Sequence, residues 1–330
     1  MTNEITQIRA LVEREMQAVD ALIVAELDKS NAPLIPLLSR HILKAGGKRL
    51  RPLLTLLAAR LGGIDQKSER HITMAAAVEF IHTATLLHDD VVDESDLRRS
   101  EPTANALWGN SASVLVGDFL LARAFQIMVG DGSLSALKLL SDTSAILSEG
   151  EVLQLSAARD LATSGEIYLA IIRAKTASLF ATAAEIGGIV AGCSATQCDA
   201  LRAYGEAVGL AFQIVDDALD YTADTKTLGK EVGDDFREGK ITLPVILAYQ
   251  SGSDTEKRFW QTAMADTAAA GDAALAQATA LIISHNAVAR SLEQAVSYSE
   301  KAVAALKLFP ESDLKTALIT LARFAVKRQF

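Results

Sequence analysis

The sequence predicts an all-α protein that forms a single domain over residues 1–330. Only six of its 330 residues are proline and 50% are hydrophobic, so helix breakers are rare and material for a core is ample. Apolar residues recur at helical spacing, as in the stretch from Ile5 to Leu27. Strand-like alternation of any length is absent from the sequence, and no repeat or low-complexity linker indicates a second domain.

Proline and glycine residues that end helices divide the first part of the chain into four expected helices. Pro33–Pro36 ends the first, and the pairs Gly46-Gly47 and Gly62-Gly63 end the next two. Pro52 suits the first turn of the third helix, and Ser68 is a candidate N-cap for the fourth. These helices are expected at about residues 5–27, 34–45, 52–61 and 68–93.

The second part of the chain continues in the same way after a polar loop over residues 94–103. A longer polar loop over residues 222–240 is rich in Gly, Asp and Lys. An unstructured connection of this length is uncommon unless it has a function. Further helices are expected at about residues 104–129, 133–158, 166–190 and 195–221, with shorter ones over 241–330.

Charge and composition exclude several classes of protein. The net charge of -9 argues against a nucleic-acid partner. Cys193 and Cys198 do not make a disulfide framework, which favours a reducing compartment. The N-terminus lacks the pattern of a signal peptide, and no uninterrupted apolar stretch approaches the roughly 18–20 residues of a membrane span. We therefore expect a cytoplasmic protein without a transmembrane segment.

Two DDxxD motifs follow apolar helical stretches. Residues four apart on a helix share a face, so each motif crowds carboxylates together. Two unit charges 4 Å apart repel by about 4 kcal/mol at an effective dielectric near 20. A bound cation offsets this repulsion, and Mg²⁺ prefers oxygen ligands. A solvated acidic helix end would explain one such cluster equally well, but its recurrence favours metal binding. The expected ligands are Asp89, Asp90, Asp93, Asp216, Asp217 and Asp220.

Basic residues near these motifs form a set that could hold two diphosphates. Gly46–Pro52 reads GGKRLRP, in which glycines and a helix start let the backbone approach an anion. His82 lies two helical turns before Asp89 on nearly the same face. Each basic residue alone is more simply a surface charge, and a lone His is more often a core residue. The candidates are Lys48, Arg51, His82, Arg98, Arg99, Lys175, Lys230 and Lys240.

These motifs, in this order, resemble the trans-isoprenyl diphosphate synthase family almost from end to end. The matching stretches are GGKRLRP at 46–52, DDVVDESDLRR at 89–99, KT at 175–176, FQIVDDALD at 212–220 and GKEVGDD at 229–235. The stretch that ends in the first motif is most similar to bacterial octaprenyl and decaprenyl diphosphate synthases of quinone biosynthesis. The resemblance implies a helical bundle of the isoprenoid synthase type around a deep central cavity, usually as a homodimer.

The resemblance also implies a reaction and a role for each motif. The expected substrates are isopentenyl diphosphate and an allylic diphosphate, farnesyl or geranyl, with about three Mg²⁺ ions per active site. Asp89, Asp93 and Asp216 would bind the metal, and the other motif aspartates would support them. Two further sets of residues would hold the substrates: Arg98, Lys175, Gln213 and Lys230 for the allylic one, and Lys48, Arg51, His82 and Arg99 for isopentenyl diphosphate, with Lys240 beside the second loop. Lys175, Thr176 and Gln213 would also stabilise the allylic cation.

Small residues upstream of Asp89 bear on the length of the product. One isoprene unit and one helical turn are both about 5 Å long, so each helical turn before Asp89 corresponds to about one isoprene unit of the product. Short-chain synthases of the family place bulky aromatics where this chain has Ala84 and Thr85. Ala77, further back on the same helix, is also small, and Phe80 is a candidate for the residue that limits the depth of the product pocket. Close helix packing would explain the small residues too, but with the resemblance they favour a product of about C40–C50, as needed for a ubiquinone side chain.

Four other functions fit the sequence less well. A short-chain farnesyl or geranylgeranyl diphosphate synthase is the nearest alternative. A noncatalytic subunit of a heteromeric synthase would usually lack an intact aspartate motif, and a class I terpene cyclase would carry only one DDxxD. A di-iron bundle needs two Glu-x-x-His pairs, whereas only Glu79 and His82 have that spacing.

Overall fold

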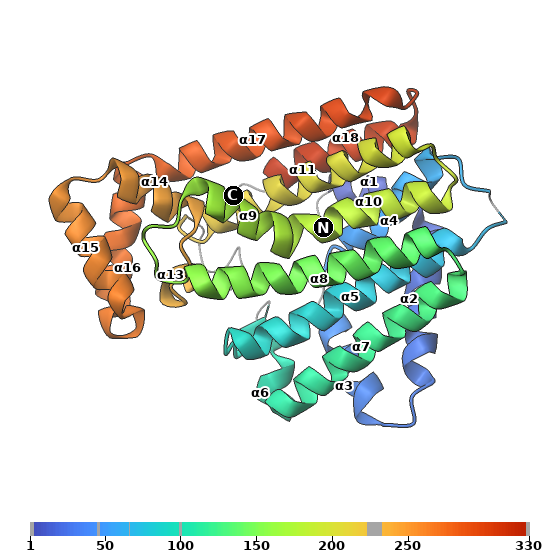
Figure 1. The fold of residues 1–330 in the computed structure, drawn as a ribbon, viewed down its shortest axis with the longest axis horizontal. Coiled ribbons are helices and arrows are strands. Elements are labelled where there is room, and N and C mark those ends of the chain that lie inside the picture. Colours follow the sequence, from blue (N-terminus) through green and yellow to red (C-terminus); the bar gives the residue numbers. More distant parts are fainter. Residues whose placement is uncertain (1–2, 45–46, 66, 99–100, 223–232, 328–330) are drawn as a thin grey trace. The chain divides into compact units, whose positions relative to one another are not determined.

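The computed structural model describes residues 3–44, 47–65, 67–98, 101–222 and 233–327, and these are almost entirely helical (Figure 1). The predicted all-α class is therefore confirmed. Contacts within the chain divide it into two compact units. Unit 1 comprises Met1–Ser144, Leu179–Glu206 and Ala302–Leu321, and unit 2 comprises Ala145–Ser178, Ala207–Lys301 and Ala322–Phe330. The single domain stays a prediction.

Unit 1 is organised around α5 (Arg70–Val92), which packs against α2, α4 and α7. The run from Met74 to Phe80 is buried at every position, which is the mark of a helix surrounded by others. Gly187 of α10 lets that helix approach α4 closely, because a Cβ there would lie 2.5 Å from the carbonyl oxygen of Thr55. The neighbours are α1 (Asn3–Ala10), α2 (Glu13–Asp28), α3 (Leu34–Lys44), α4 (Leu50–Leu61), α6 (Ala104–Trp108), α7 (Asn110–Asp131) and α10 (Ser178–Val190).

Unit 2 has its own apolar core, centred on the fully buried Trp260. The rings of Phe236 and Phe259 meet the indole edge-on, with centroids 6.5 and 5.5 Å away. The helices here are α9 (Gly165–Ile172), α13 (Asp234–Arg237), α14 (Leu243–Ser251), α15 (Asp254–Ala265) and α16 (Thr267–Ser284). Four further helices each have residues in both units: α8 (Leu134–Ala157), α11 (Ala195–Leu219), α17 (Ala287–Ala305) and α18 (Asp313–Val326). The short 3-10 turn η2 (Leu306–Leu308) precedes α18.

Several expected helices differ in their details. The first is broken at Leu11–Val12, where the N–H groups of both residues form turn hydrogen bonds, and its second part ends at Asp28, before the prolines. Glu69, not Ser68, is the N-cap of α5, although the Ser68 hydroxyl accepts from the Arg70 N–H. Gly109 has φ 83° and separates α6 from α7.

Short segments of other structure were also missed. The loop after the first aspartate motif contains a small antiparallel hairpin, β1 (Leu97–Arg98) with β2 (Glu101–Pro102). The helix expected over 166–190 contains a π-helical turn, η1 (Arg173–Ala177). Two elements, α7 and the stretch Gly165–Val190, are long and apolar enough to span a membrane by length and composition alone, a test that buried core helices also pass. Charged residues interrupt the apolar runs, among them Asp118 and Arg123 in α7 and Arg173 in the second stretch, and 56% of the second window is buried inside the protein.

Candidate active site

The first aspartate motif ends α5 and separates its three carboxylates into two environments. Asp89 and Asp93 are half-buried, whereas the Asp90 side chain is 1% exposed. Arg98 of β1 donates to Asp90 Oδ1 from Nε at 2.8 Å and from Nη2 at 2.7 Å. A hydrogen-bonded guanidinium compensates the burial of that carboxylate. Asp90 therefore fixes Arg98 beside the motif, and the carboxylates of Asp89 and Asp93 lie nearer to solvent.

Close contact with α7 fixes the end of α5 that carries this motif. The Ser113 hydroxyl donates to the Leu87 carbonyl oxygen at 2.9 Å. His88 packs directly on Gly117, where a Cβ would lie 2.3 Å from His88 Nε2. A side chain at this position would therefore have to displace the imidazole of the histidine next to Asp89.

The second aspartate motif, at the end of α11, shows the same division. Asp216 is half-buried, while Asp217 and Asp220 are 5% and 7% exposed. Tyr168 Oη and Gln213 Nε2 each donate to Asp217 at 2.7 Å. Burial and, after it, the nearby Asp235 together raise the pKa of Asp217 to about 7, although the two hydrogen bonds act in the opposite direction. Asp220 accepts a hydrogen bond from the Asp235 N–H at 3.1 Å.

A π-helical turn carries Lys175 and Thr176 and brings Thr176 to the second motif. The Thr176 hydroxyl donates to Gln213 Oε1 at 2.8 Å, so Gln213 links it to Asp217. Lys175 Nζ forms an ion pair with Glu151 of α8 at 2.7 Å. Single π-turns in helices occur frequently at functional sites, since they re-aim side chains. The chain thus forms one continuous polar network from Thr176 to Tyr168.

The GGKRLRP motif places basic residues beside His82 within unit 1. Arg51 Nη1 lies 3.0 Å from His82 Nε2, and the Arg51 guanidinium lies 4.4 Å from the centroid of the Phe180 ring. Lys48 is half-buried just before α4. Arg51 of α4 and His82 of α5, two predicted substrate residues, therefore lie side by side.

The proposed product-length residues lie along the buried part of α5. Ala77, Phe80 and Ala84 are 0%, 2% and 2% exposed. Thr85 is half-buried, and its hydroxyl donates to the His82 carbonyl oxygen at 2.8 Å. Their burial fits either a cavity wall or simple helix packing, so the product-length assignment stays a prediction.

Two predicted site residues, Arg99 and Lys230, lie outside the described residues, as does much of the loop over 222–240. Lys240 forms an ion pair with Glu238. Within the described part of the chain, no group of three or more His, Cys, Asp or Glu side chains could hold a metal ion by itself. The half-buried carboxylates of Asp89, Asp93 and Asp216 offer oxygen atoms of the kind that Mg²⁺ accepts beside water and phosphate oxygens.

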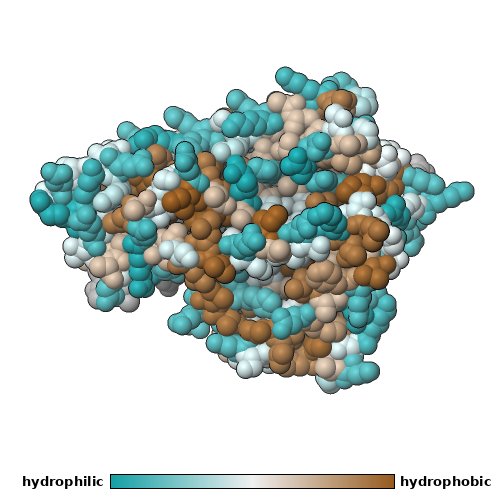
Figure 2. Space-filling view, viewed as in Figure 1, coloured by the Kyte–Doolittle hydropathy of each residue, from teal (hydrophilic) through white to brown (hydrophobic). Residues whose placement is uncertain are grey.

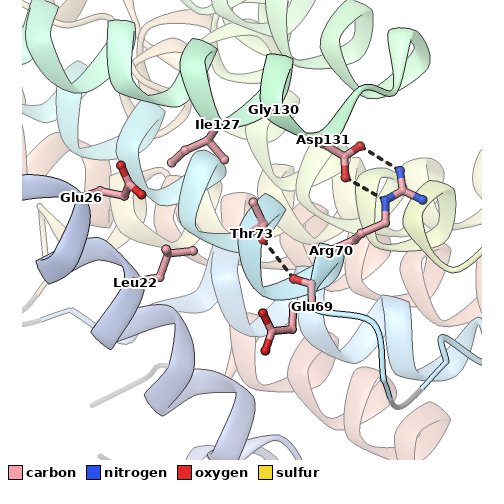
Figure 3. Close-up of a pocket in the computed structure, with 8 residues that line it drawn as sticks. All are labelled: Leu22, Glu26, Glu69, Arg70, Thr73, Ile127, Gly130 and Asp131. Atoms are coloured by element: carbon pink, nitrogen blue, oxygen red, sulfur yellow. Dashed lines mark hydrogen bonds and ion pairs between the residues drawn. The ribbon is translucent and has the colours of Figure 1, made fainter.

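A surface pocket of about 420 Å³ lies at the opposite end of α5 from the first motif (Figure 3). Arg70 and Asp131 close one side with a paired hydrogen bond at 2.7 and 2.8 Å. Thr73, Leu22 and Ile127 supply other parts of the wall. Nineteen residues of α5 separate Arg70 from Asp89, which is about 28 Å of helix, so this pocket is not the aspartate site.

Several residues that contact the predicted site residues were not identified from the sequence. Tyr168 and Glu151 bind Asp217 and Lys175, but each lies far along the chain from its partner. Gly150 was also missed: a Cβ there would lie 2.7 Å from the Lys175 backbone nitrogen, so its absence lets the π-turn approach α8. No local pattern indicated these contacts.

Comparisons with known proteins find relatives that match almost the whole chain. The sequence profile of the polyprenyl synthetase family matches residues 32–282. The octaprenyl diphosphate synthase of Escherichia coli strain K12 is 44% identical over 322 residues, which cover 98% of each chain. Two crystal structures are also similar. A polyprenyl synthase of Caulobacter crescentus CB15, complexed with calcium and isoprenyl diphosphate, has a TM-score of 0.94 at 50% identity and covers 98% of this chain and 97% of its own. A decaprenyl diphosphate synthase of Rhodobacter capsulatus has a TM-score of 0.93 at 47% identity, covering 98% and 99%.

Proposed function

Because this chain belongs to the polyprenyl synthetase family of prenyltransferases, we propose that it condenses isopentenyl diphosphate with an allylic diphosphate into a long all-trans polyprenyl diphosphate. The observation that carries the proposal is the division within both aspartate motifs. In each, buried carboxylates are held by hydrogen bonds while others stay half-buried. Such an arrangement suits metal binding, since fixed neighbours orient the ligands.

The proposed roles follow the environment of each residue. Asp89, Asp93 and Asp216 bind Mg²⁺, and the three buried aspartates orient the side chains around them. The allylic diphosphate is held by Arg98, Lys175, Gln213 and Lys230. Isopentenyl diphosphate is held by Lys48, Arg51, His82 and Arg99. When bound, about three Mg²⁺ ions would neutralise charge on the departing diphosphate.

The chain's own residues would guide the reaction. The allylic C–O bond breaks, the diphosphate leaves, and the double bond of isopentenyl diphosphate attacks the allylic carbon. A proton is then lost to the released diphosphate, which restores an allylic product. The hydroxyl of Thr176 and the amide of Gln213 are already linked, so their dipoles are fixed in advance and can stabilise the positive charge.

We further propose a product of about eight to ten isoprene units that serves as a ubiquinone side chain, made in the cytoplasm by a homodimer. The support for this length is the similarity to octaprenyl and decaprenyl synthases together with the small residues at Ala84 and Thr85. Geranyl or farnesyl diphosphate would be the primer.

Product length is the direct test. Purified protein is incubated with Mg²⁺, farnesyl diphosphate and labelled isopentenyl diphosphate, and the dephosphorylated product is sized by chromatography. A product of about eight to ten units supports the proposal, whereas three or four units would make the enzyme a short-chain synthase. No elongation at all would refute the enzymatic assignment and favour a noncatalytic subunit.

Substitution at Ala84 tests the route of the growing chain. Ala84 is 2% exposed on α5, five residues before Asp89. Ala84→Phe should shorten the product to about three or four units, because the ring would block a tail that runs along α5 at about one unit per turn. The matched control is Ala59→Phe, which places the same ring at a fully buried alanine of α4. An unchanged length in a folded Ala84→Phe enzyme would mean that the tail takes another path.

A further inference from the structure

Arg49 lies between two proposed ligands of isopentenyl diphosphate, Lys48 and Arg51, yet its backbone is unusual. Its φ of 47° and ψ of 43° lie in the left-handed region, which side chains other than Gly and Asn rarely adopt. It immediately precedes Leu50, the first residue of α4, and its side chain makes no capping hydrogen bond to the helix. Contacts elsewhere must therefore hold this turn.

Those contacts come from two other helices of unit 1. Arg49 Nη1 donates to Glu79 Oε1 of α5 at 2.9 Å, and Arg49 Nη2 lies 3.5 Å from Asp20 Oδ1 of α2. The side chains of Arg49 and Glu79 are only 16% and 9% exposed. Solvent therefore screens the ion pair weakly, and it ties the turn before α4 to the side of α5.

Glu79 also lies next to the other half of the proposed substrate site. It precedes His82 by three residues, so the two share one face of α5. His82 Nε2 is 3.0 Å from Arg51 Nη1. Burial raises the pKa of the Glu79 carboxyl, while the charges of Arg49 and Arg51 lower it. The Glu79 carboxylate is thus held in a buried position that disfavours its charge, and the two arginines nearby offset that cost.

We propose that Arg49 and Glu79 form a positioning pair that holds the left-handed turn against α5, so that Lys48, Arg51 and His82 present their polar groups to the diphosphate of isopentenyl diphosphate together. The inference rests on the proposed function, which assigns that substrate to these three residues. In this arrangement Arg49 is not a ligand. Its guanidinium is committed to Glu79 and Asp20, and it acts through the backbone of its neighbours.

Steady-state kinetics separate positioning from a purely structural role. Arg49→Gln and Glu79→Gln should each raise the KM for isopentenyl diphosphate about tenfold or more, while the KM for the allylic substrate changes less than about twofold. Arg60→Gln is the matched control, since Arg60 lies at the other end of α4 and also pairs with a carboxylate of α2, Glu15. It should leave both KM values unchanged. Equal rises for both substrates, or an unchanged KM in a folded Arg49→Gln enzyme, would overturn the proposal.

The double variant tests whether the two residues act as a unit. If they do, Arg49→Gln combined with Glu79→Gln should raise the KM no further than the worse single change. Effects that multiply would show that the residues act independently and would contradict a positioning pair. Thermal unfolding of all four variants identifies any that fail to fold, and Arg49→Lys, which keeps the charge, then replaces Arg49→Gln.

A binding measurement separates this inference from the proposed reaction. Isopentenyl diphosphate is titrated calorimetrically into wild-type protein and Arg49→Gln without allylic substrate. If the wild type binds it but does not elongate it, and the variant binds at least tenfold more weakly, the reaction is wrong and the positioning pair is supported. Equal affinities of wild type and variant, or no binding by the wild type, would overturn the pair.

Discussion

Within one DDxxD motif the carboxylates lie in different environments, and burial distinguishes them. Asp90 is 1% exposed and committed to Arg98, and Asp217 is committed to Tyr168 and Gln213. Asp89 and Asp216 are half-buried. A carboxylate that already accepts two charged or polar donors gains less from a metal ion than one facing solvent. The residues that bind the metal and those that orient the site can therefore be told apart by substitution.

The first prediction concerns the half-buried aspartates. Asp89→Ala and Asp216→Ala should each lower turnover by about two orders of magnitude or more, because charge on the leaving diphosphate is no longer neutralised. The fold should persist, as judged by circular dichroism and the unfolding temperature. Asp142→Ala is the control, an aspartate 54% exposed on α8 and paired only along its own helix with Lys138. Near-normal turnover in either motif variant would refute the metal assignment.

At the scale of elements, the position of the π-turn depends on what is missing from the neighbouring helix. Gly150 has no side chain, and the backbone of Lys175 and Ala174 fills that space. Next to it, Glu151 holds the Lys175 ammonium at 2.7 Å. One short stretch of α8 thus sets both the backbone and the side chain of a proposed catalytic residue.

We therefore expect Gly150→Ala to lower turnover about tenfold to a hundredfold. The new Cβ would lie 2.7 Å from the Lys175 nitrogen and 2.8 Å from Ala174 Cβ, so the π-turn must shift, at a cost of about 1–3 kcal/mol in stability. The control is Gly130→Ala in α7, where a Cβ meets nothing within 4 Å. Steady-state kinetics and thermal unfolding of both variants provide the measurement. Equal effects of the two substitutions would contradict a specific role for Gly150.

The ion pair of Arg70 and Asp131 ties the start of α5 to the end of α7 (Figure 3). The hydrogen bond from Arg70 lowers the pKa of Asp131 below its ordinary value. A lowered folded-state pKa stabilises the fold above the unfolded pKa, near 3.9, and that contribution is lost as pH falls through the folded value. Arg70 is 43% exposed, so solvent screening limits the effect to about 1 kcal/mol or less.

Asp131→Asn should therefore unfold more easily than the wild type at pH 7, and the difference in unfolding free energy should shrink as the pH is lowered from 5 toward 3. Urea unfolding at several pH values measures it. Asp142→Asn, which removes an exposed pair on α8, should show a smaller difference. A difference that stays constant with pH would mean that the charge of Asp131 is not what stabilises the contact.

Comparison with the sequence shows which kinds of feature a sequence pattern can reveal. Helical spacing placed Asp89 and Asp93 together and set His82 on a nearby face, since these relations lie within one helix. The pairing of Asp217 with Tyr168 joins positions 49 residues apart, and no local pattern encodes it. The left-handed turn at Arg49 was equally hidden, because the stabilising Glu79 comes from another helix. Breaks such as that at Val12 also depend on packing rather than on a Gly or Pro signal.

At the scale of the whole molecule, one surface of α7 bears on assembly. Leu115, Ala122 and Val129 are spaced seven residues apart and exposed, which places them on one face of the helix. Leu115 and Val129 are 66% and 63% exposed. Figure 2 shows apolar side chains gathering over α7, and only 39% of its apolar window is buried within the chain. An apolar stripe of this kind marks a contact surface, and a second copy of the chain is the occupant that the proposed homodimer supplies.

The wild-type protein should therefore sediment at about 70 kDa, twice the chain mass of 35.1 kDa. Leu115→Glu combined with Val129→Glu should shift it toward 35.1 kDa, because each charge would have to be buried unpaired at a two-fold contact. Leu308→Glu is the control, since Leu308 is also an exposed leucine, 51% accessible, but lies on the short turn before α18. Analytical ultracentrifugation decides between the outcomes. A wild-type monomer, or a dimer that survives both charges, would mean that this face of α7 contacts something other than a second copy of the chain.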